Sequence, residues 1–170
     1  MEELVDMREM TEQELIEAGQ MAEIVFKLNH TLPNSEEYNN LLKELLGNNL
    51  GENSTIIAPI AGAAFDHIKI GDNVFINSNI LLMARGGITI EDDVMIAGNV
   101  QLLSNNHDEY DRQILICKPI LIKKGSMDWS WGKHIAWSYR WKVCNRWCRS
   151  NSDKRHSRLC SCSRFTCESC

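Results

Sequence analysis

The sequence predicts a mainly-β protein, a β-solenoid preceded by two helices. Three observations lead to this prediction: a six-residue repeat in the middle of the chain, two helical stripes ahead of it, and no apolar run that approaches the roughly 20 residues of a membrane helix. A chain of 170 residues is long enough for one domain with one core. We therefore expect a helical segment over 1–50, a repeat region over 51–126 and a different tail over 127–170.

Two helices are predicted before the repeat. Thr11 and Glu14 form a T-x-x-E capping box, and the apolar residues that follow at helical spacing are Leu15, Ala18, Ala22, Val25 and Phe26. Ser35 is expected to cap a second helix that ends at Gly47-Asn48-Asn49 and whose stripe is Tyr38, Leu41, Leu42, Leu45 and Leu46. We expect this helical hairpin to pack against the repeat region through both stripes.

The repeat begins at residue 68. In sixes, the chain reads IKIGDN, VFINSN and ILLMAR, then, after an insert of two glycines, ITIEDD, VMIAGN and VQLLSN, and after a loop ILIKKG. The first and third positions are aliphatic and the last is usually Asn, Asp or Gly, so each unit predicts a short strand and a turn. A strict short period is typical of a β-solenoid, in which stacked triangular coils share one core. Strands of a β-sandwich, the alternative, are not phased so strictly.

The repeat and the second helix resemble the maltose/galactoside O-acetyltransferase family of hexapeptide-repeat proteins. The match rests on LNHTLPNSEEYNNLLKELLG, IGDNVFINSNILLM, ITIEDDVMIAGNVQLLSNNHD and KPILIKKG, and covers most of residues 28–125. The resemblance implies a left-handed parallel β-helix, a homotrimer, and transfer of an acetyl group from acetyl-CoA, the co-substrate, to a hydroxyl of a sugar or similar small acceptor. The handedness comes from the resemblance alone, because the general rule for parallel crossovers would give a right-handed coil.

His107, in LLSNNHDEYD, matches the histidine that removes a proton from the acceptor hydroxyl in this family. A hydroxyl is a poor nucleophile until its proton is taken, and a base with a pKa near neutrality does this best. Histidine is the side chain that titrates in that range. We therefore expect His107 to be the catalytic base rather than an ordinary solvated loop histidine.

Two further residues fall at acceptor-binding positions of the family. Asn77, in VFINSN, matches an asparagine that hydrogen-bonds the acceptor sugar; an ordinary asparagine on a side of the coil is the alternative. Arg85 stands at or beside a position where the family usually has Asp, so a hydrogen-bond donor replaces an acceptor. The family's N-terminal acceptor-binding Asp motif is not visible either. Both departures bear on the identity of the acceptor and leave the base untouched.

The tail differs from everything before it. Residues 1–126 carry a net charge of −11 and residues 127–170 one of +6, and all five Trp and six of the seven Cys lie past residue 126. Read one base out of phase, MDWSWG permits Trp-Ile-Gly-Ala-Gly. Three later stretches permit Pro-Gly-Val-Thr, Val-Thr-Lys-Asp-Ile-Pro and Ser-Pro-Ala-Lys-Val, so the family's C-terminal motifs follow in order. We therefore expect the tail to be the same gene read in the wrong frame, irregular as written.

Other interpretations of the chain were weighed. The tail cysteines with His134 and His156 could suggest a zinc site, but their spacing is irregular for one. The basic charge of the tail could suit nucleic acid. The frame shift explains both the excess of cysteine and the basic charge. We expect neither metal nor nucleic acid as a partner. A γ-class carbonic anhydrase needs three histidines, and the repeat region offers only His67 and His107. The remaining alternative is a truncated scaffold without an acetyl-CoA site. The charged start is no signal peptide, so we expect a cytoplasmic protein without membrane contact.

Overall fold

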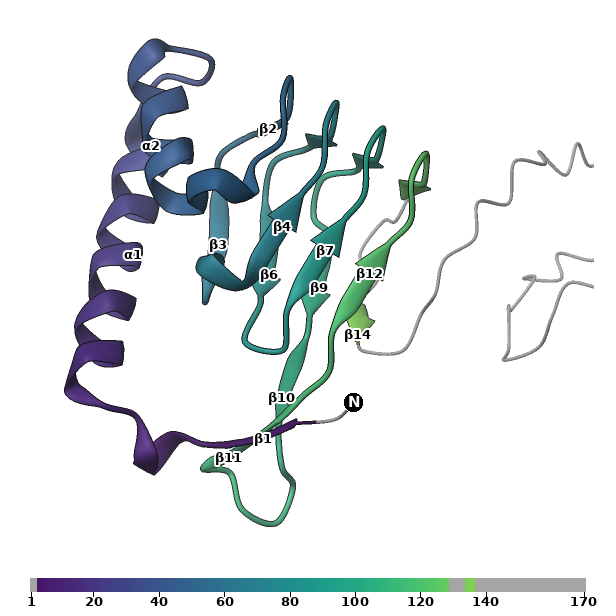
Figure 1. Ribbon diagram of the computed structural model, residues 1–170. Helices are drawn as coiled ribbons and strands as arrows, with labels where there is room; N and C mark the ends of the chain where they lie inside the picture. The colour runs from purple at the N-terminus through teal and green to yellow at the C-terminus, as the bar shows by residue number, and fades with distance from the viewer. Residues whose placement is uncertain (1–2, 129–133, 137–170) are drawn as a thin grey trace, which may run out of the picture.

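The computed structural model describes residues 3–128 and 134–136 of the chain. In this part, two helices lead into a coil of short strands, and a hairpin leaves the coil after its third turn (Figure 1). The helices are α1 (Glu12–His30) and α2 (Glu36–Leu46), with 3₁₀ turns at η1 (Met7–Glu9), η2 (Gly47–Asn49) and η3 (Phe65–His67). The strands are β1 (Glu3–Asp6), β2 (Thr55–Ile56), β3 (Ile60–Ala63), β4 (Ile68–Ile70), β5 (Phe75–Ile76), β6 (Ile80–Met83), β7 (Ile88–Ile90), β8 (Met95–Ile96), β9 (Gln101–Leu103), β10 (Asn105–His107), β11 (Ile114–Cys117), β12 (Ile120–Ile122), β13 (Met127–Asp128) and β14 (His134–Ala136).

The coil strands form parallel sheets, one on each side of a three-sided coil. The sheet orders are β4-β7-β12, β2-β5-β8-β13 and β3-β6-β9-β14. Before the hairpin, the register pairs residues that are 20 apart in sequence, as Ile68 with Ile88 and Ile60 with Ile80. Across the hairpin the separation is larger, as for Ile88 with Ile120. Equivalent residues of successive turns therefore stack on one another, and the predicted mainly-β fold with N-terminal helices is confirmed. Among the described residues, no helix has the length and apolar character that crossing a bilayer requires.

The inward-facing aliphatic residues of the repeat form the core. The first and third residues of every unit predicted from the sequence are at most 5% exposed, which confirms the repeat. Full burial of one such side chain stabilises a fold by about 1.5–3 kcal/mol relative to its exposed state. Stacked along the coil, these side chains make a continuous apolar column that fixes the register of each turn.

The coil begins before residue 68, where the first six-residue unit was read from the sequence. Leu50 already bridges Ile70, and β2 and β3 complete a first turn. The sequence contained a signal for this turn, because LGEN at 50–53 parallels IGDN at 70–73. The unit at residue 60 was missed because Gly62 occupies its aliphatic third position. The φ of Gly62 is +152°, and a Cβ there would lie 2.8 Å from the carbonyl carbon of Leu82.

At the other end, two short strands extend the coil past the boundary predicted at residue 126. β13 pairs with β8 and β14 pairs with β9, both in parallel. The rest of the tail lies outside the described residues, and so do the predicted change of reading frame and the cysteines considered for zinc.

The last position of most units is the place where the chain turns. Residues at this position have φ between 55° and 64°, namely Asn53, Asn73, Asn79, Asp93 and Asn99. Asn and Asp enter this left-handed region more readily than other residues with a side chain. Their side chains also bond along the coil: the amide of Asn53 donates to Asn73 (3.4 Å), that of Asn73 to Asp93 (3.3 Å), and that of Asn79 to Asn99. Backbone conformation and stacking together explain the repeated Asn and Asp.

Both helices begin where the sequence predicts. Thr11 and Glu14 form the capping box of α1, and the hydroxyl of Ser35 accepts a hydrogen bond from the N–H of Tyr38 (3.1 Å) at the start of α2. The predicted stripe of α2 is buried except for the half-buried Leu41. Tyr38 also donates its hydroxyl hydrogen to the carbonyl of Ile56 (2.8 Å) and so anchors α2 to the first turn of the coil.

The predicted stripe of α1 is wrong except at Val25, because its other four members, Leu15, Ala18, Ala22 and Phe26, are exposed. Leu15 and Phe26 are 58% and 63% exposed. The helix packs on α2 and β3, and its contacts with the core come from residues spaced i, i+3, i+4 and i+7, namely Met21, Ile24, Val25 and Leu28. Two overlapping stripes share this helix, and the position of α2 and β3 decides which one is covered.

The first strand was not predicted. β1 pairs antiparallel with β11, which in turn pairs with β10. The start of the chain therefore lies beside a hairpin that is more than 100 residues later in sequence (Figure 1). A single added strand depends on the free edge that the hairpin offers, and the local sequence of residues 3–6 carries no sign of that edge.

Candidate active site

The hairpin leaves the coil at one of its three corners, which we call the hairpin corner. This corner joins the sheet β3-β6-β9-β14 to the sheet β4-β7-β12 and comprises residues 64–67, 84–87 and 104–119. Ser104 is fully buried at the base of the hairpin. Its hydroxyl donates to the carbonyl of Met83 (2.8 Å) and accepts from the N–H of Gly86 (3.0 Å). The hairpin is thus anchored to the preceding turn of the coil.

His107 is the last residue of β10, and it is exposed. Its Nδ1 lies 2.6 Å from the carbonyl oxygen of Arg112. A carbonyl oxygen can only accept a hydrogen bond, so Nδ1 carries the hydrogen, and in the neutral ring Nε2 then keeps its lone pair. The hydrogen bond therefore holds the ring as the tautomer that can take a proton at Nε2.

The turn between β10 and β11 supports the carbonyl that holds His107. The carboxylate of Asp108 accepts hydrogen bonds from backbone N–H groups of the turn. The backbone N–H of Asp111 (2.9 Å) contributes most to holding the pKa of Asp108 below its usual range. Asp111 in turn accepts from the N–H of Gln113 through its carboxylate (3.1 Å) and from the N–H of Ile114 through its carbonyl (2.9 Å). The backbone on both sides of Arg112 is therefore held by hydrogen bonds.

Sequence reasoning missed the residues that support His107. Asp111 lies close to His107 in the chain and had a local signal, a run of acidic residues typical of a turn. Arg8, whose Nη2 lies 3.0 Å from Oδ2 of Asp111, stands 103 residues away from it. No local pattern connects the two segments, so only the folded chain shows this contact.

Arg85 lies at the hairpin corner and is already paired. Its Nη2 is 2.9 Å from Oε1 of Glu14 at the start of α1, and its side chain is 28% exposed. Its backbone N–H donates to the side-chain oxygen of Asn105, where β10 begins (3.3 Å). The pKa of Glu14 falls to about 2, first because the backbone of Thr11 donates to it and then because Arg85 does. Arg85 thus connects α1 with the base of the hairpin.

Asn77 lies on a different corner of the coil. It stands between β5 and β6 and is exposed. Its side-chain oxygen accepts from the N–H of Ser78 (2.7 Å), and its backbone N–H donates to the carbonyl of Ile96 (2.9 Å). Of the three predicted site residues, a single chain brings Arg85 and His107 to one corner and leaves Asn77 on the neighbouring corner.

The described residues hold no cluster suited to a metal ion. Within 3–128 and 134–136, no three His, Cys, Asp or Glu side chains come together in a way that could ligate one. His67 lies at the hairpin corner, with Nδ1 3.2 Å from the carbonyl of Arg85 and Nε2 3.3 Å from Asp66. This part of the chain therefore gives no support to the carbonic anhydrase alternative.

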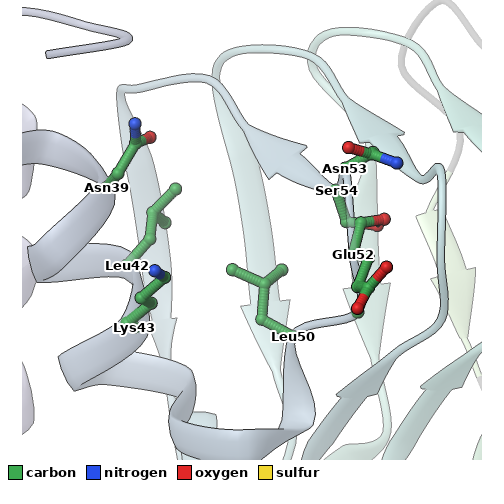
Figure 2. A pocket seen from close by; sticks show the side chains of 8 residues that line it. Asn39, Leu42, Lys43, Leu50, Glu52, Asn53 and Ser54 are labelled. Atoms are coloured by element: carbon green, nitrogen blue, oxygen red, sulfur yellow. The ribbon is translucent and has the colours of Figure 1, made fainter. Parts of the chain in front are cut away.

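An open groove lies away from the hairpin corner. It has a volume of about 500 Å³ and runs between α2 and the first turn of the coil. Figure 2 shows Asn39 and Lys43 on α2, with Glu52 and Asn53 on the coil beyond Leu50. Its coil residues belong to the corner between the sheets β4-β7-β12 and β2-β5-β8-β13, so the groove includes none of the predicted site residues.

Solved structures resemble this chain, whereas no family model and no curated protein sequence matches it. A hexapeptide-repeat acetyltransferase from Vibrio cholerae is 30% identical over 69% of this chain and 68% of its own, with a TM-score of 0.64. A galactoside acetyltransferase in complex with coenzyme A is 25% identical over 74% and 70%, with a TM-score of 0.62. A maltose O-acetyltransferase from Clostridium difficile is 25% identical over 69% and 65%, with a TM-score of 0.64.

Proposed function

The chain belongs to the hexapeptide-repeat acetyltransferases, and from this membership we propose that it moves an acetyl group from acetyl-CoA to a hydroxyl of a sugar or similar small acceptor, with His107 as general base. The observation that carries the role of His107 is its hydrogen bond to the carbonyl of Arg112 (2.6 Å). In the neutral ring this bond places the lone pair on Nε2 of an exposed residue, which is what the reaction requires of a base.

The proposed transfer is direct. Nε2 of His107 takes the proton of the acceptor hydroxyl while the hydroxyl oxygen attacks the thioester carbonyl carbon of acetyl-CoA. The new C–O bond forms as the C–S bond breaks, and the leaving thiolate of coenzyme A receives the proton back from His107. The carbonyl of Arg112 stabilises the intermediate imidazolium because it accepts the hydrogen bond of Nδ1–H. A positioned base of this kind typically contributes ~10²–10⁴-fold to the rate.

Acetyl-CoA is the acetyl donor, as the coenzyme A bound to the similar galactoside acetyltransferase supports. The family resemblance implies that much of the acetyl-CoA site lies in the coils and the loop that follow the position of residue 126 here. Those positions fall mostly outside the described residues. We therefore assign no residue of this chain to the acetyl-CoA site.

A sugar is the proposed acceptor, because two of the similar proteins are named for galactoside and for maltose. Asn77 is exposed, and its side-chain oxygen already accepts from Ser78, so its amide group is the part that would donate to an acceptor hydroxyl. Arg85 is the second acceptor-binding candidate, at the corner of His107. Since Asn77 and His107 lie on different corners of one chain, a site with both would form between two copies, as in the proposed homotrimer.

Release of the coenzyme A thiol tests the function, with acetyl-CoA and a panel of maltose, galactosides and simple alcohols. The assay compares the 170-residue chain with a chain whose reading frame is restored after residue 126, and the kinetic variants are made in the frame-restored chain. We expect His107→Gln to lower kcat by ~10²–10⁴-fold, because the hydroxyl keeps its proton, with little change in the KM for the acceptor. The same preparations, examined by sedimentation equilibrium, are expected to contain three chains per particle.

His30→Gln is the matched control. The Nδ1 of His30 also lies against a backbone carbonyl, that of Phe26 (2.7 Å), but on α1. This variant is expected to keep the turnover of the unchanged chain. Full turnover by His107→Gln would exclude His107 as the base. A folded chain with no turnover on any acceptor would favour the alternative, a truncated scaffold that lacks the acetyl-CoA site.

A further inference from the structure

The segment before α1 follows the hairpin that carries His107. β1 pairs with β11 from Glu3, opposite Cys117, to Asp6, opposite Ile114. The N–H of Met7 then donates to the carbonyl of Gln113 (2.8 Å). No residue of β1 or η1 is fully buried, so the segment contributes little to the core. Packing against the core therefore does not explain why the segment follows the hairpin so closely.

Arg8 connects this segment with the turn of the hairpin. Its Nε donates to Oδ1 of Asp6 (2.8 Å), and its Nη2 donates both to Oδ2 of Asp6 (2.6 Å) and to Oδ2 of Asp111 (3.0 Å). These carboxylates, Asp6 first, raise the pKa of Arg8 above its ordinary value, so the guanidinium stays charged. The planar fork of an arginine can hold two carboxylates at fixed angles, which the point charge of a lysine does not do.

Asp111 carries this contact to His107. One carboxylate oxygen of Asp111 accepts from Arg8, and the other accepts from the N–H of Gln113 (3.1 Å). The carbonyl of Arg112 lies within this short turn and accepts the hydrogen bond of Nδ1 (2.6 Å). We propose that Arg8 is a positioning residue: by holding Asp111, it fixes the turn whose Arg112 carbonyl keeps His107 in the tautomer with the hydrogen on Nδ1.

The tautomer decides whether the ring can act as a base at Nε2. With the hydrogen on Nε2, that atom has no lone pair to take a proton, and the ring can only accept at Nδ1. A turn that is no longer held lets the Arg112 carbonyl move away, and the exposed ring then exchanges between both tautomers. The effect of Arg8 on turnover rests on the proposed role of His107, whereas its effect on the tautomer does not.

Arg8→Gln tests the proposal by two measurements, imidazole NMR on the 170-residue chain and turnover in the frame-restored chain. Nitrogen-15 NMR of the neutral imidazole separates protonated from unprotonated ring nitrogens, and His107→Gln identifies the signals of His107. The unchanged chain is expected to show a protonated Nδ1 and an unprotonated Nε2. Arg8→Gln is expected to shift both signals toward a mixture and to lower kcat by up to ~10²-fold, the cost of a reacting group misplaced by about 1 Å, without a change in the KM for the acceptor.

Lys27→Gln is the matched control, because it removes another exposed ion pair, with Glu23 (2.8 Å), from α1. It is expected to leave the signals of His107 and the kcat unchanged. The proposal is wrong if Arg8→Gln keeps the wild-type signals, if Lys27→Gln shifts them equally, or if the unchanged chain carries the hydrogen on Nε2. Full turnover by His107→Gln would instead overturn the proposed base, while the nitrogen signals would still decide the role of Arg8.

Discussion

At the scale of single residues, the corners of the coil restrict which side chains fit. A Cβ added to Gly71 would lie 2.8 Å from the backbone nitrogen of Asp92 and would also meet its carboxylate. The N–H of Gly71 donates to the carbonyl of Ile90 (2.8 Å), and the N–H of Asp72 donates to the carboxylate of Asp92 (3.1 Å). Hydrogen bonds on both sides hold the two turns at this separation, so the neighbour cannot move aside without losing them.

We expect Gly71→Ala to lower the free energy of unfolding by about 1–3 kcal/mol, the usual cost of forcing an extra carbon into a packed site. Chemical denaturation of the full chain measures it. Gly19→Ala is the control: nothing lies within 4 Å of its Cβ position in α1, and alanine favours a helix by up to about 1 kcal/mol over glycine. If Gly71→Ala and Gly19→Ala have the same free energy of unfolding, the corner accommodates a Cβ and the prediction is wrong.

At the scale of elements, one carboxylate both starts α1 and joins it to the coil. Glu14 accepts from the N–H of Thr11 (2.9 Å) and from its hydroxyl (3.0 Å), which completes the capping box. It also accepts from Arg85 (2.9 Å), which stands 71 residues later at the hairpin corner. The start of the helix and the corner that carries His107 are therefore linked through a single ionised group.

This link predicts a loss of stability in acid. The pKa of Glu14 is about 2 in the fold and 4.5 ordinarily. A lowered pKa means that the ionised group stabilises the fold above pH 4.5 and that this stabilisation is lost as the pH falls toward 2. We expect Glu14→Gln to melt at a lower temperature than the unchanged chain at pH 7, with the difference shrinking between pH 4.5 and pH 2.

The melting temperatures of both chains between pH 7 and pH 2 measure this effect. Arg85→Gln supplies the control, because it removes one donor to Glu14 and leaves the capping box intact. The difference in melting temperature between Arg85→Gln and the unchanged chain should also shrink between pH 4.5 and pH 2. If the melting temperatures of Glu14→Gln and the unchanged chain differ by the same amount down to pH 2, the lowered pKa of Glu14 is wrong.

At the scale of the whole molecule, the coil is a stack in which each turn contacts its neighbours. α2 covers the first turn through buried residues such as Leu42 and through the hydrogen bond from Tyr38 to Ile56. β13 and β14 are the last coil strands of the described residues. The family motifs that the shifted frame permits would supply the turns that follow, where the resemblance places most of the acetyl-CoA site.

We therefore expect a base to be missing or added in the gene across the codons for Lys124 to Trp131. Sequencing that stretch tests the frame directly. A frame-restored chain is expected to transfer acetyl, and the 170-residue chain as written to do so poorly or not at all. Turnover by the 170-residue chain equal to that of the restored chain would contradict this prediction. A confirmed frame would make the truncated scaffold the leading interpretation.

The local sequence determined the coil. Aliphatic residues at every second position, followed by Asn or Asp where φ is positive, specify a strand and a turn within six residues, as in the unit that ends at Asn73. Capping residues such as Thr11 and Ser35 likewise act within one helical turn. The identity of His107 as a candidate came from a family motif, which is also contiguous in sequence.

The tertiary structure alone decided what surrounds His107. The contact of Arg8 with Asp111 joins residues 103 apart, and that of Glu14 with Arg85 joins residues 71 apart. It also decided which face of α1 is buried and that Asn77 lies on a different corner from His107. These features depend on how separate segments meet in space, because an ion pair or an added strand needs a partner whose position only the completed coil defines.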